Sequence, residues 1–226
     1  MTVPYQYPRL SAHDAKSLKD LVKQGEGTLL EFKLKTNHPE KIVKEVVAFA
    51  NTKGGQLLIG IGDDRSVKGL RFSDEDEFLL VRAIEKYIYP MIDYTIERVP
   101  IDGNREVLIF DIAESPMKPH YVDLESNIDT RTAYIRVADK SVKASKEVRE
   151  ILKGQRKMVN VKFQFGDKEK QLMQYLADNE RITVDEFAKI SVLPRKVASK
   201  TLVILVLSGV LKIQPNEISD FFVVKS

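Results

Sequence analysis

The chain has 226 residues, of which 43% are hydrophobic, and this is enough to bury a substantial core in one or two domains. It contains no cysteine, which excludes disulfides and thiolate zinc sites, so a bound metal would need oxygen or histidine ligands. Its formal net charge of +3 is only mildly basic, and whole-chain charge therefore does not establish a polyanionic partner.

The first predicted elements are a helix over residues 11–24, which Gly25 ends, and a strand over residues 28–35. Charged and hydrophobic residues alternate along this strand, and alternate residues of a strand point to opposite faces. The strand is therefore predicted to have one apolar face and one face with charges of both signs. These faces carry, respectively, Leu30, Phe32 and Leu34, and Glu31, Lys33 and Lys35.

A helix and a buried strand are expected next. Pro39 suits the first position of the helix, because that position needs no backbone N–H, and the preceding asparagine or histidine can cap it. Two glycines at residues 54–55 end the helix. Residues 56–61 are apolar and short enough for a buried strand, and the aspartates at residues 63–64 form a turn at its end.

Hairpin-linked strands and two more helices complete the first part of the chain. Ser73 and Asp76 form a capping-box variant at the start of one helix, and Ser145 caps the other. Asp-Gly-Asn at residues 102–104 is a strong hairpin signal. We therefore expect a mixed α+β domain over residues 1–155. Its predicted helices cover residues 73–89 and 145–154, and its predicted strands cover residues 94–99, 106–112 and 132–137.

Four short blocks stand out in this part of the chain. In order, they are Glu31-Phe32-Lys33, the run AFANTKGG at residues 48–55, Ile59-Gly60-Ile61 followed by Asp63-Asp64, and Tyr134-Ile135-Arg136. Through these blocks the chain resembles, over roughly residues 15 to 150, the Schlafen AlbA-like domain, which is found in many bacterial regulators. The resemblance implies a domain with a mixed sheet that contacts DNA.

The resemblance also implies an enzymatic alternative. Schlafen nucleases hold a divalent metal with an acidic set for RNA cleavage, and Glu26, Glu31 and either Asp63 or its neighbouring aspartate are similar to that set, with Lys33 nearby. Such ligands bind Mg²⁺ or Mn²⁺, and the metal can activate water. Gly62, however, stands where many members have another acidic residue, and a surface ion pair beside a turn would explain the same residues. We therefore prefer a protein with neither enzymatic activity nor cofactor, and keep a metal-dependent endoribonuclease as the alternative.

The last part of the chain has a different pattern, in which three helices precede a hairpin, the winged-helix plan. Thr183 and Glu186 form a capping box, and the short connection before Pro194 is the tight turn of a helix-turn-helix. We therefore expect a small winged helix-turn-helix domain over residues 167–226, although a protein–protein module is a competing interpretation. Its elements cover residues 168–178, 184–191, 194–208, 211–214 and 221–224.

Several basic residues are candidates for contact with nucleic acid. The third helix of the winged-helix domain is its predicted recognition helix, and its first turns offer donors for phosphates and base edges. The stretch over residues 140–162 is the most basic of the chain, and it could neutralise phosphates or serve as a solvated face and linker. The selected residues are Arg136, Lys153, Arg156, Lys157, Arg195, Lys196, Ser199 and Lys200.

Residues 202–207 are apolar all round, which predicts either a homodimer contact or cover by another part of the same chain. No N-terminal signal pattern is present, and no apolar run approaches the roughly 20 residues of a membrane helix. We therefore expect a cytoplasmic, homodimeric DNA-binding protein without a membrane partner, acting as a transcriptional regulator. The winged helix supplies readout, and the AlbA-like domain adds nucleic-acid or ligand contact, with RNA as a second candidate partner.

Overall fold

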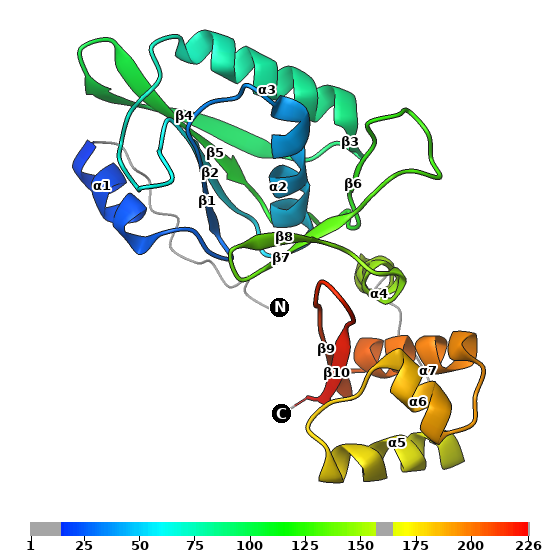
Figure 1. Cartoon of the computed structure of the whole chain (residues 1–226). Helices are drawn as coiled ribbons and strands as arrows, with labels where there is room; N and C mark the ends of the chain where they lie inside the picture. The colour runs from blue at the N-terminus through cyan, green and yellow to red at the C-terminus, as the bar shows by residue number, and fades with distance from the viewer. Residues whose placement is uncertain (1–14, 157–164, 226) are drawn as a thin grey trace, which may run out of the picture.

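A mixed four-stranded sheet, in the order β1-β2-β5-β4, organises the first part of the chain (Figure 1). β1 (Leu30–Lys33) pairs in parallel with β2 (Gly55–Ile59). β5 (Arg105–Ile112) pairs antiparallel with both β2 and β4 (Tyr94–Asp102). The expected combination of a mixed sheet with helices is therefore confirmed.

Helices cover both faces of this sheet (Figure 1). α2 (Pro39–Asn51) and α3 (Ser73–Tyr87) pack on one face, and α1 (Ala15–Gln24) packs on the other. Because successive side chains of a strand alternate, Leu57 contributes to the core under α2 while Leu58 contributes to the core under α1. The sheet is therefore a buried central layer.

Smaller antiparallel sheets border this layer. β3 (Ile88–Tyr89) pairs with β6 (Tyr121–Val122), and β7 (Tyr134–Val137) pairs with β8 (Lys140–Lys143). α4 (Lys146–Arg156) follows β8. β7 lies close to α2, which brings the last of the four sequence blocks next to the first two (Figure 1).

The last part of the chain consists of three helices and a two-stranded antiparallel sheet around a separate hydrophobic core. The helices are α5 (Asp167–Asp178), α6 (Val184–Ile190) and α7 (Arg195–Leu207), and the strands are β9 (Leu211–Gln214) and β10 (Phe221–Val224). This element order follows the predicted one. Among the described helices, none combines the length and apolar character needed to cross a bilayer.

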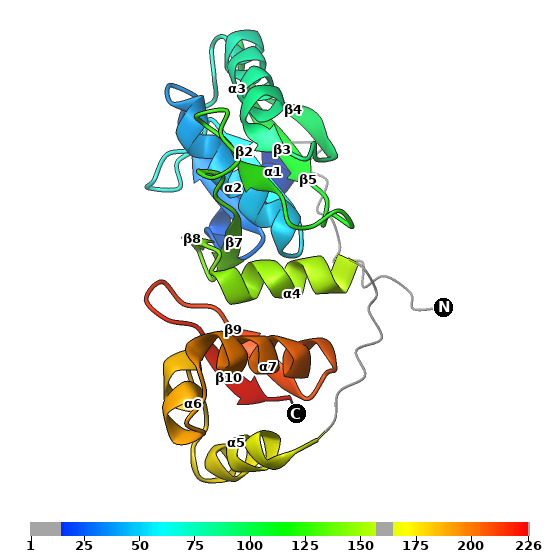
Figure 2. The same cartoon turned by 90° about the vertical axis from the view of Figure 1, so that its right-hand side faces the viewer.

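α4 lies between the first part of the chain and α7 (Figure 2), and it packs against α7. The Ser199 hydroxyl of α7 donates to Glu147 Oε1 of α4 at 2.5 Å. At Gly154 the helices approach so closely that a Cβ would lie 2.5 Å from Leu207 Cδ1. α4 of the same chain thus covers part of the apolar surface of α7, and Ile204, Val206 and Leu207 stay half-buried.

Local helix signals were partly confirmed. The Thr183–Glu186 capping box is present, and the Ser145 hydroxyl accepts from the Val148 N–H at 3.1 Å. The predicted Ser73–Asp76 capping box is wrong, because Ser73 binds Glu106 of β5 and Asp76 binds Thr36 in the loop after β1 instead. The structure describes residues 15–156 and 165–225, so the start of the first predicted helix lies outside the described residues.

A candidate nucleic-acid interface

Arg136 lies on β7 with a side chain that is 0% exposed. Its Nη1 donates to Glu31 Oε2 and Glu45 Oε2, each at 2.9 Å, and its Nη2 donates to the Gly27 carbonyl at 2.6 Å. The guanidinium also lies over the Phe49 ring, 4.8 Å from its centroid. Arg136 therefore links β7 to β1 and α2. The prediction that it contacts nucleic acid is corrected, because its charge is used inside the protein.

The same network uses the central carboxylate of the predicted metal set. Glu31 is buried and accepts from Arg136 and from the Lys33 ammonium. Glu26 points elsewhere, since its Oε1 accepts from the Phe32 backbone N–H at 3.0 Å. These carboxylates already have protein donors, which favours a structural role for both.

Asp63 completes the predicted metal set, and it is exposed in the turn after β2. Its neighbour Asp64 accepts from the Ser66 hydroxyl and backbone N–H, and these hydrogen bonds lower the pKa of Asp64. Within residues 15–156 and 165–225, no three acidic or histidine side chains are grouped so that they could hold a metal ion. Among these described residues, Glu26, Glu31 and Asp63 are therefore not brought together as a ligand set for Mg²⁺ or Mn²⁺.

The run AFANTKGG has an architectural role. Asn51 Nδ2 donates to the carbonyls of His120 and Tyr134, each at 2.9 Å, and Asn51 Oδ1 accepts from the His120 N–H at 2.7 Å. The Thr52 hydroxyl accepts from the Arg136 N–H at 2.9 Å. At Gly54, with φ +75°, the backbone has a conformation that favours glycine. This run thus fastens the end of α2 to β7 and to His120, which directly precedes β6.

His120 is fully buried beside this junction. Its Nδ1 lies 2.8 Å from the Pro90 carbonyl oxygen and its Nε2 lies 2.6 Å from the Ser115 hydroxyl. Burial lowers the pKa of His120, and the charges of Lys118 and Arg156 add to this effect, while the Pro90 carbonyl opposes it. The imidazole is therefore a neutral structural group near pH 7.

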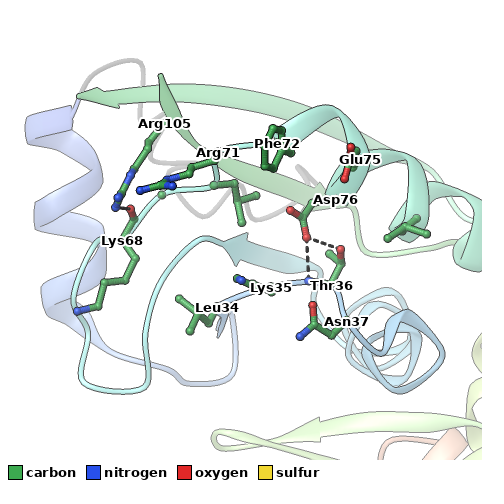
Figure 3. A pocket seen from close by; sticks show the side chains of 13 residues that line it. Leu34, Lys35, Thr36, Asn37, Lys68, Arg71, Phe72, Glu75, Asp76 and Arg105 are labelled. Carbon is green, nitrogen blue, oxygen red and sulfur yellow. Dashed lines mark hydrogen bonds between the residues drawn. The ribbon is translucent and has the colours of Figure 1, made fainter. Parts of the chain in front are cut away.

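A cationic pocket of about 610 Å³ opens at the opposite end of the first part, where β1 ends and α3 begins (Figure 3). Its cations are Lys35 and Lys68, Arg71 and Arg105, and the exposed aromatic ring of Phe72 stands beside them. Sequence reasoning did not select these residues. Its other lining residues are Leu34, Thr36, Asn37, Gly69, Leu70, Glu75, Asp76 and Leu79.

The walls of this cationic pocket are held by hydrogen bonds. Leu70 and Glu106 exchange backbone hydrogen bonds of 2.7 and 3.0 Å, which fix the loop against the start of β5. Asp76 Oδ1 accepts from the Thr36 N–H at 3.0 Å and also from its hydroxyl (Figure 3). Gly69 has φ +66°, and a Cβ there would lie 2.9 Å from Arg105 Cβ. The pocket is therefore a built part of the fold.

A second cationic surface lies along α4 and α7. A groove of about 420 Å³ between these helices has the side chains of Val203, Ile204 and Leu207 along it. Four lysines line the same groove, two from each helix, and all are exposed. Glu150 is the acidic residue lining it, and it pairs with one of these lysines at 2.9 Å. The four are Lys146, Lys153, Lys196 and Lys200, which we call the lysine quartet.

The remaining predicted contact residues have different environments. Arg195 is exposed at the start of α7, and its Nε donates to Asp185 Oδ1 at 2.7 Å. Arg156 is exposed at the end of α4, and Lys157 lies outside the described residues. Ser199 is buried against α4 through its hydrogen bond to Glu147. The prediction that Ser199 contacts nucleic acid is therefore corrected, because helix packing takes up its hydroxyl.

The family comparison agrees with this arrangement. A family model described as "Schlafen, AlbA_2" matches residues 26–145, just over half of the chain. The chain therefore belongs to the Schlafen AlbA_2 family, and this membership associates it with nucleic-acid-related function. The matched residues contain the buried Arg136 network and the cationic pocket, and they end before α4.

Two solved structures are similar to the chain. One is the N-terminal domain of a RecG-related protein from Nitrosomonas europaea, with 22% identity and a TM-score of 0.41, covering 50% of this chain and 82% of that one. The other is the DIP2311 protein from Corynebacterium diphtheriae, also with 22% identity and a TM-score of 0.41. That match covers 56% of this chain but only 24% of the other.

Proposed function

We propose that this protein is a DNA-binding transcriptional regulator whose residues 167–226 act as a winged helix-turn-helix domain. The order of three helices and a hairpin, the Thr183–Glu186 capping box and the tight connection before α7 support this assignment. The AlbA-like domain, residues 1–155, adds nucleic-acid or ligand contact. DNA is the main partner in this proposal, and RNA is a second one.

The observation that carries the proposal is the lysine quartet. Two helices, one from each part of the chain, bring four exposed ammonium groups to one groove, with Glu150 as the acidic residue beside them. Ammonium groups on flexible stems bind phosphates as point charges, and their contact with DNA releases counterions. The quartet is therefore suited to a nucleic-acid backbone.

The position of α4 determines how α7 would meet DNA. The major groove is about 12 Å wide, and packed helices lie about 8–10 Å apart, so α7 and α4 together are too wide to enter it. The N-terminal tip of α7, with Arg195, would therefore reach base edges, as recognition helices do. Lys196, Lys200 and the two lysines of α4 would contact phosphates on either side.

A homodimer remains part of the proposal, because helix-turn-helix dimers match two-fold symmetric DNA sites. Light scattering on the purified protein measures this directly, with a dimer mass as the expected result. The endoribonuclease alternative is not carried forward, because its carboxylates are engaged in hydrogen bonds or lie in a separate turn.

The proposal is tested by the double variant Lys196→Ala/Lys200→Ala. It should weaken binding of a short duplex, measured by fluorescence anisotropy, by at least about tenfold, or ~1.4 kcal/mol for two phosphate contacts. The matched control Lys19→Ala/Lys86→Ala removes the same charge from exposed positions on α1 and α3. It should bind like the wild type, and equal weakening in both variants would refute a role for the quartet.

A further inference from the structure

We propose that the cationic pocket binds one nucleotide unit, with its base stacked on Phe72 and its phosphate held by the surrounding cations. The unit would be either a free nucleotide or part of an unpaired nucleic-acid strand, which share this chemistry. The inference names the ligand of the contact that the proposed function gives to the AlbA-like domain, but it does not depend on the winged helix or the lysine quartet.

The charges of the pocket favour a phosphate. Within the described residues, no ion pair is formed by the pocket's four cations, Lys35, Lys68, Arg71 and Arg105, although Arg105 Nη1 donates to the Lys68 carbonyl at 3.0 Å. Two acids, Glu75 and Asp76, also line the pocket, so four cations face two carboxylates and an excess of two positive charges remains. The excess of positive charge therefore lacks a partner within the described protein, and a phosphate would supply one.

The apolar side chains of the pocket favour a base. Phe72 is 68% exposed, and Leu34 and Leu79, which also line the pocket, are 44% and 46% exposed. Single exposed hydrophobic residues are ordinary, but an aromatic ring among unpaired cations is the usual arrangement for stacking a base while holding its backbone. Stacking on an aromatic ring is worth about 1–3 kcal/mol per base.

The construction of the pocket also suits a specific ligand. Its volume of about 610 Å³ falls within the range of small-molecule sites, about 300–1,000 Å³. The Leu70–Glu106 backbone pair and the Thr36–Asp76 hydrogen bonds hold its walls in place, so a ligand need not order them. Asn37 and Glu75 supply amide and carboxylate groups for the edge of a base.

A neighbouring pocket suggests where a bound nucleic-acid strand could continue. A second pocket of about 620 Å³ is lined by the turn between β4 and β5 and shares Arg71, Phe72 and Arg105 with the cationic pocket. A chain of nucleotides could therefore pass from one hollow to the other across the same aromatic ring and the same two guanidinium groups. A free nucleotide would need only the first hollow.

The experiment measures binding of a fluorescent single-stranded oligonucleotide to the full chain by anisotropy. Phe72→Ala should weaken binding about tenfold, in line with the loss of one stacked base. Arg71→Ala should lower the magnitude of the salt slope by about 0.7, the value for one phosphate contact on a single strand. The matched controls are Phe78→Ala and Arg82→Ala, which alter an exposed aromatic and an arginine of α3 outside the pocket.

Competition by adenosine diphosphate distinguishes the two sources of the ligand. Displacement of the oligonucleotide, lost in Phe72→Ala, identifies a free nucleotide as a ligand, whereas no displacement together with the Phe72 effect identifies an unpaired strand. Equal affinity of Phe72→Ala and Phe78→Ala overturns the proposal, as does displacement by inorganic phosphate alone with no effect of Phe72→Ala.

Binding of duplex DNA, measured on the same variants, should be unchanged. Failure of the proposal for the cationic pocket is therefore separable from failure of the proposal for the lysine quartet.

Discussion

The Arg136 network and the lysine quartet both contain charged side chains, but they differ in whether the positive charges are paired with acids inside the protein. Arg136 is enclosed between Glu31 and Glu45, and each of its Nη atoms donates to a protein oxygen. The lysines of the quartet are exposed, and only Lys153 pairs with an acid, Glu150, among the described residues. The first region therefore uses charge to hold elements together, and the second presents charge to a partner.

This difference has a physical origin. A buried charge is tolerated only when it is paired and hydrogen-bonded, so its removal is costly to the fold. An exposed ammonium group is solvated, and its loss costs the fold little. Stability and nucleic-acid affinity should therefore respond to different residues, and each of the following changes tests that separation.

The largest effect on stability is expected for Arg136→Met. It should lower the free energy of unfolding by about 3–5 kcal/mol, because Glu31 and Glu45 lose the buried guanidinium that they share. Urea denaturation followed by circular dichroism measures this change. Arg71→Met, in the exposed pocket, should alter stability by less than about 0.5 kcal/mol. A variant of Arg136 that kept its stability but lost DNA affinity would reverse the assignment.

Asn51→Ala should lower the free energy of unfolding by a smaller amount. The substitution leaves the buried N–H and carbonyl of His120 and the part-buried carbonyl of Tyr134 without this partner, at a cost of about 1–3 kcal/mol. Thermal unfolding measures this loss of stability. The control is Asn37→Ala, because Asn37 is exposed. Similar stability of the two variants would remove the architectural role of the AFANTKGG block.

Ser199 offers a comparison within the C-terminal part. Ser199→Ala should cost about 1.5–3 kcal/mol, because it removes a buried hydrogen bond to the carboxylate of Glu147, and it should leave DNA affinity unchanged. Ser191→Ala is the matched control, because the buried Ser191 Oγ has no hydrogen-bond partner among the described atoms. Removing the Ser191 hydroxyl should therefore leave the free energy of unfolding unchanged. Weaker DNA binding by Ser199→Ala at full stability would restore the hydroxyl as a contact.

The weakest expected effect is a dependence of stability on pH. Because burial lowers the pKa of His120, the unfolded chain binds a proton on this residue more readily than the folded protein. The free energy of unfolding should therefore fall as the pH is lowered through about 6.5, the ordinary pKa of histidine. Denaturation at several pH values tests this, and His120→Gln should flatten that part of the profile, whereas an unchanged profile in His120→Gln would contradict the assignment.

Local signals in the sequence predicted much of the fold. The Thr183–Glu186 capping box, the proline at the start of α2 and the two C-terminal strands all depend on residues close together in the chain, and all were confirmed. The Ser73–Asp76 capping box was wrong because Ser73 binds Glu106, 33 residues away. A local sequence pattern cannot show that a side chain will bind a residue far away in the chain instead of capping its own helix.

The candidate site was harder to predict for the same reason. Glu31 and Arg136 are separated by 105 residues, and their contact buries Glu31, while Lys35 on the same face of the predicted strand stays exposed. The cationic pocket unites residues near positions 35, 70 and 105 because the Leu70–Glu106 backbone pair joins two of these segments and the Thr36–Asp76 hydrogen bonds fasten the third to α3. The run of Lys68, Arg71 and Phe72 was the one local hint, since it combines cations with an aromatic residue.

The separation between structural and binding charges is tested most directly by the salt dependence of duplex DNA binding. Each phosphate contact contributes about −0.9 to the slope of log K against log salt concentration. Lys196→Ala/Lys200→Ala should therefore reduce the magnitude of the slope by about 1.8, while Lys19→Ala/Lys86→Ala should retain the wild-type slope. Identical slopes for the wild type and the Lys196→Ala/Lys200→Ala variant would contradict the account.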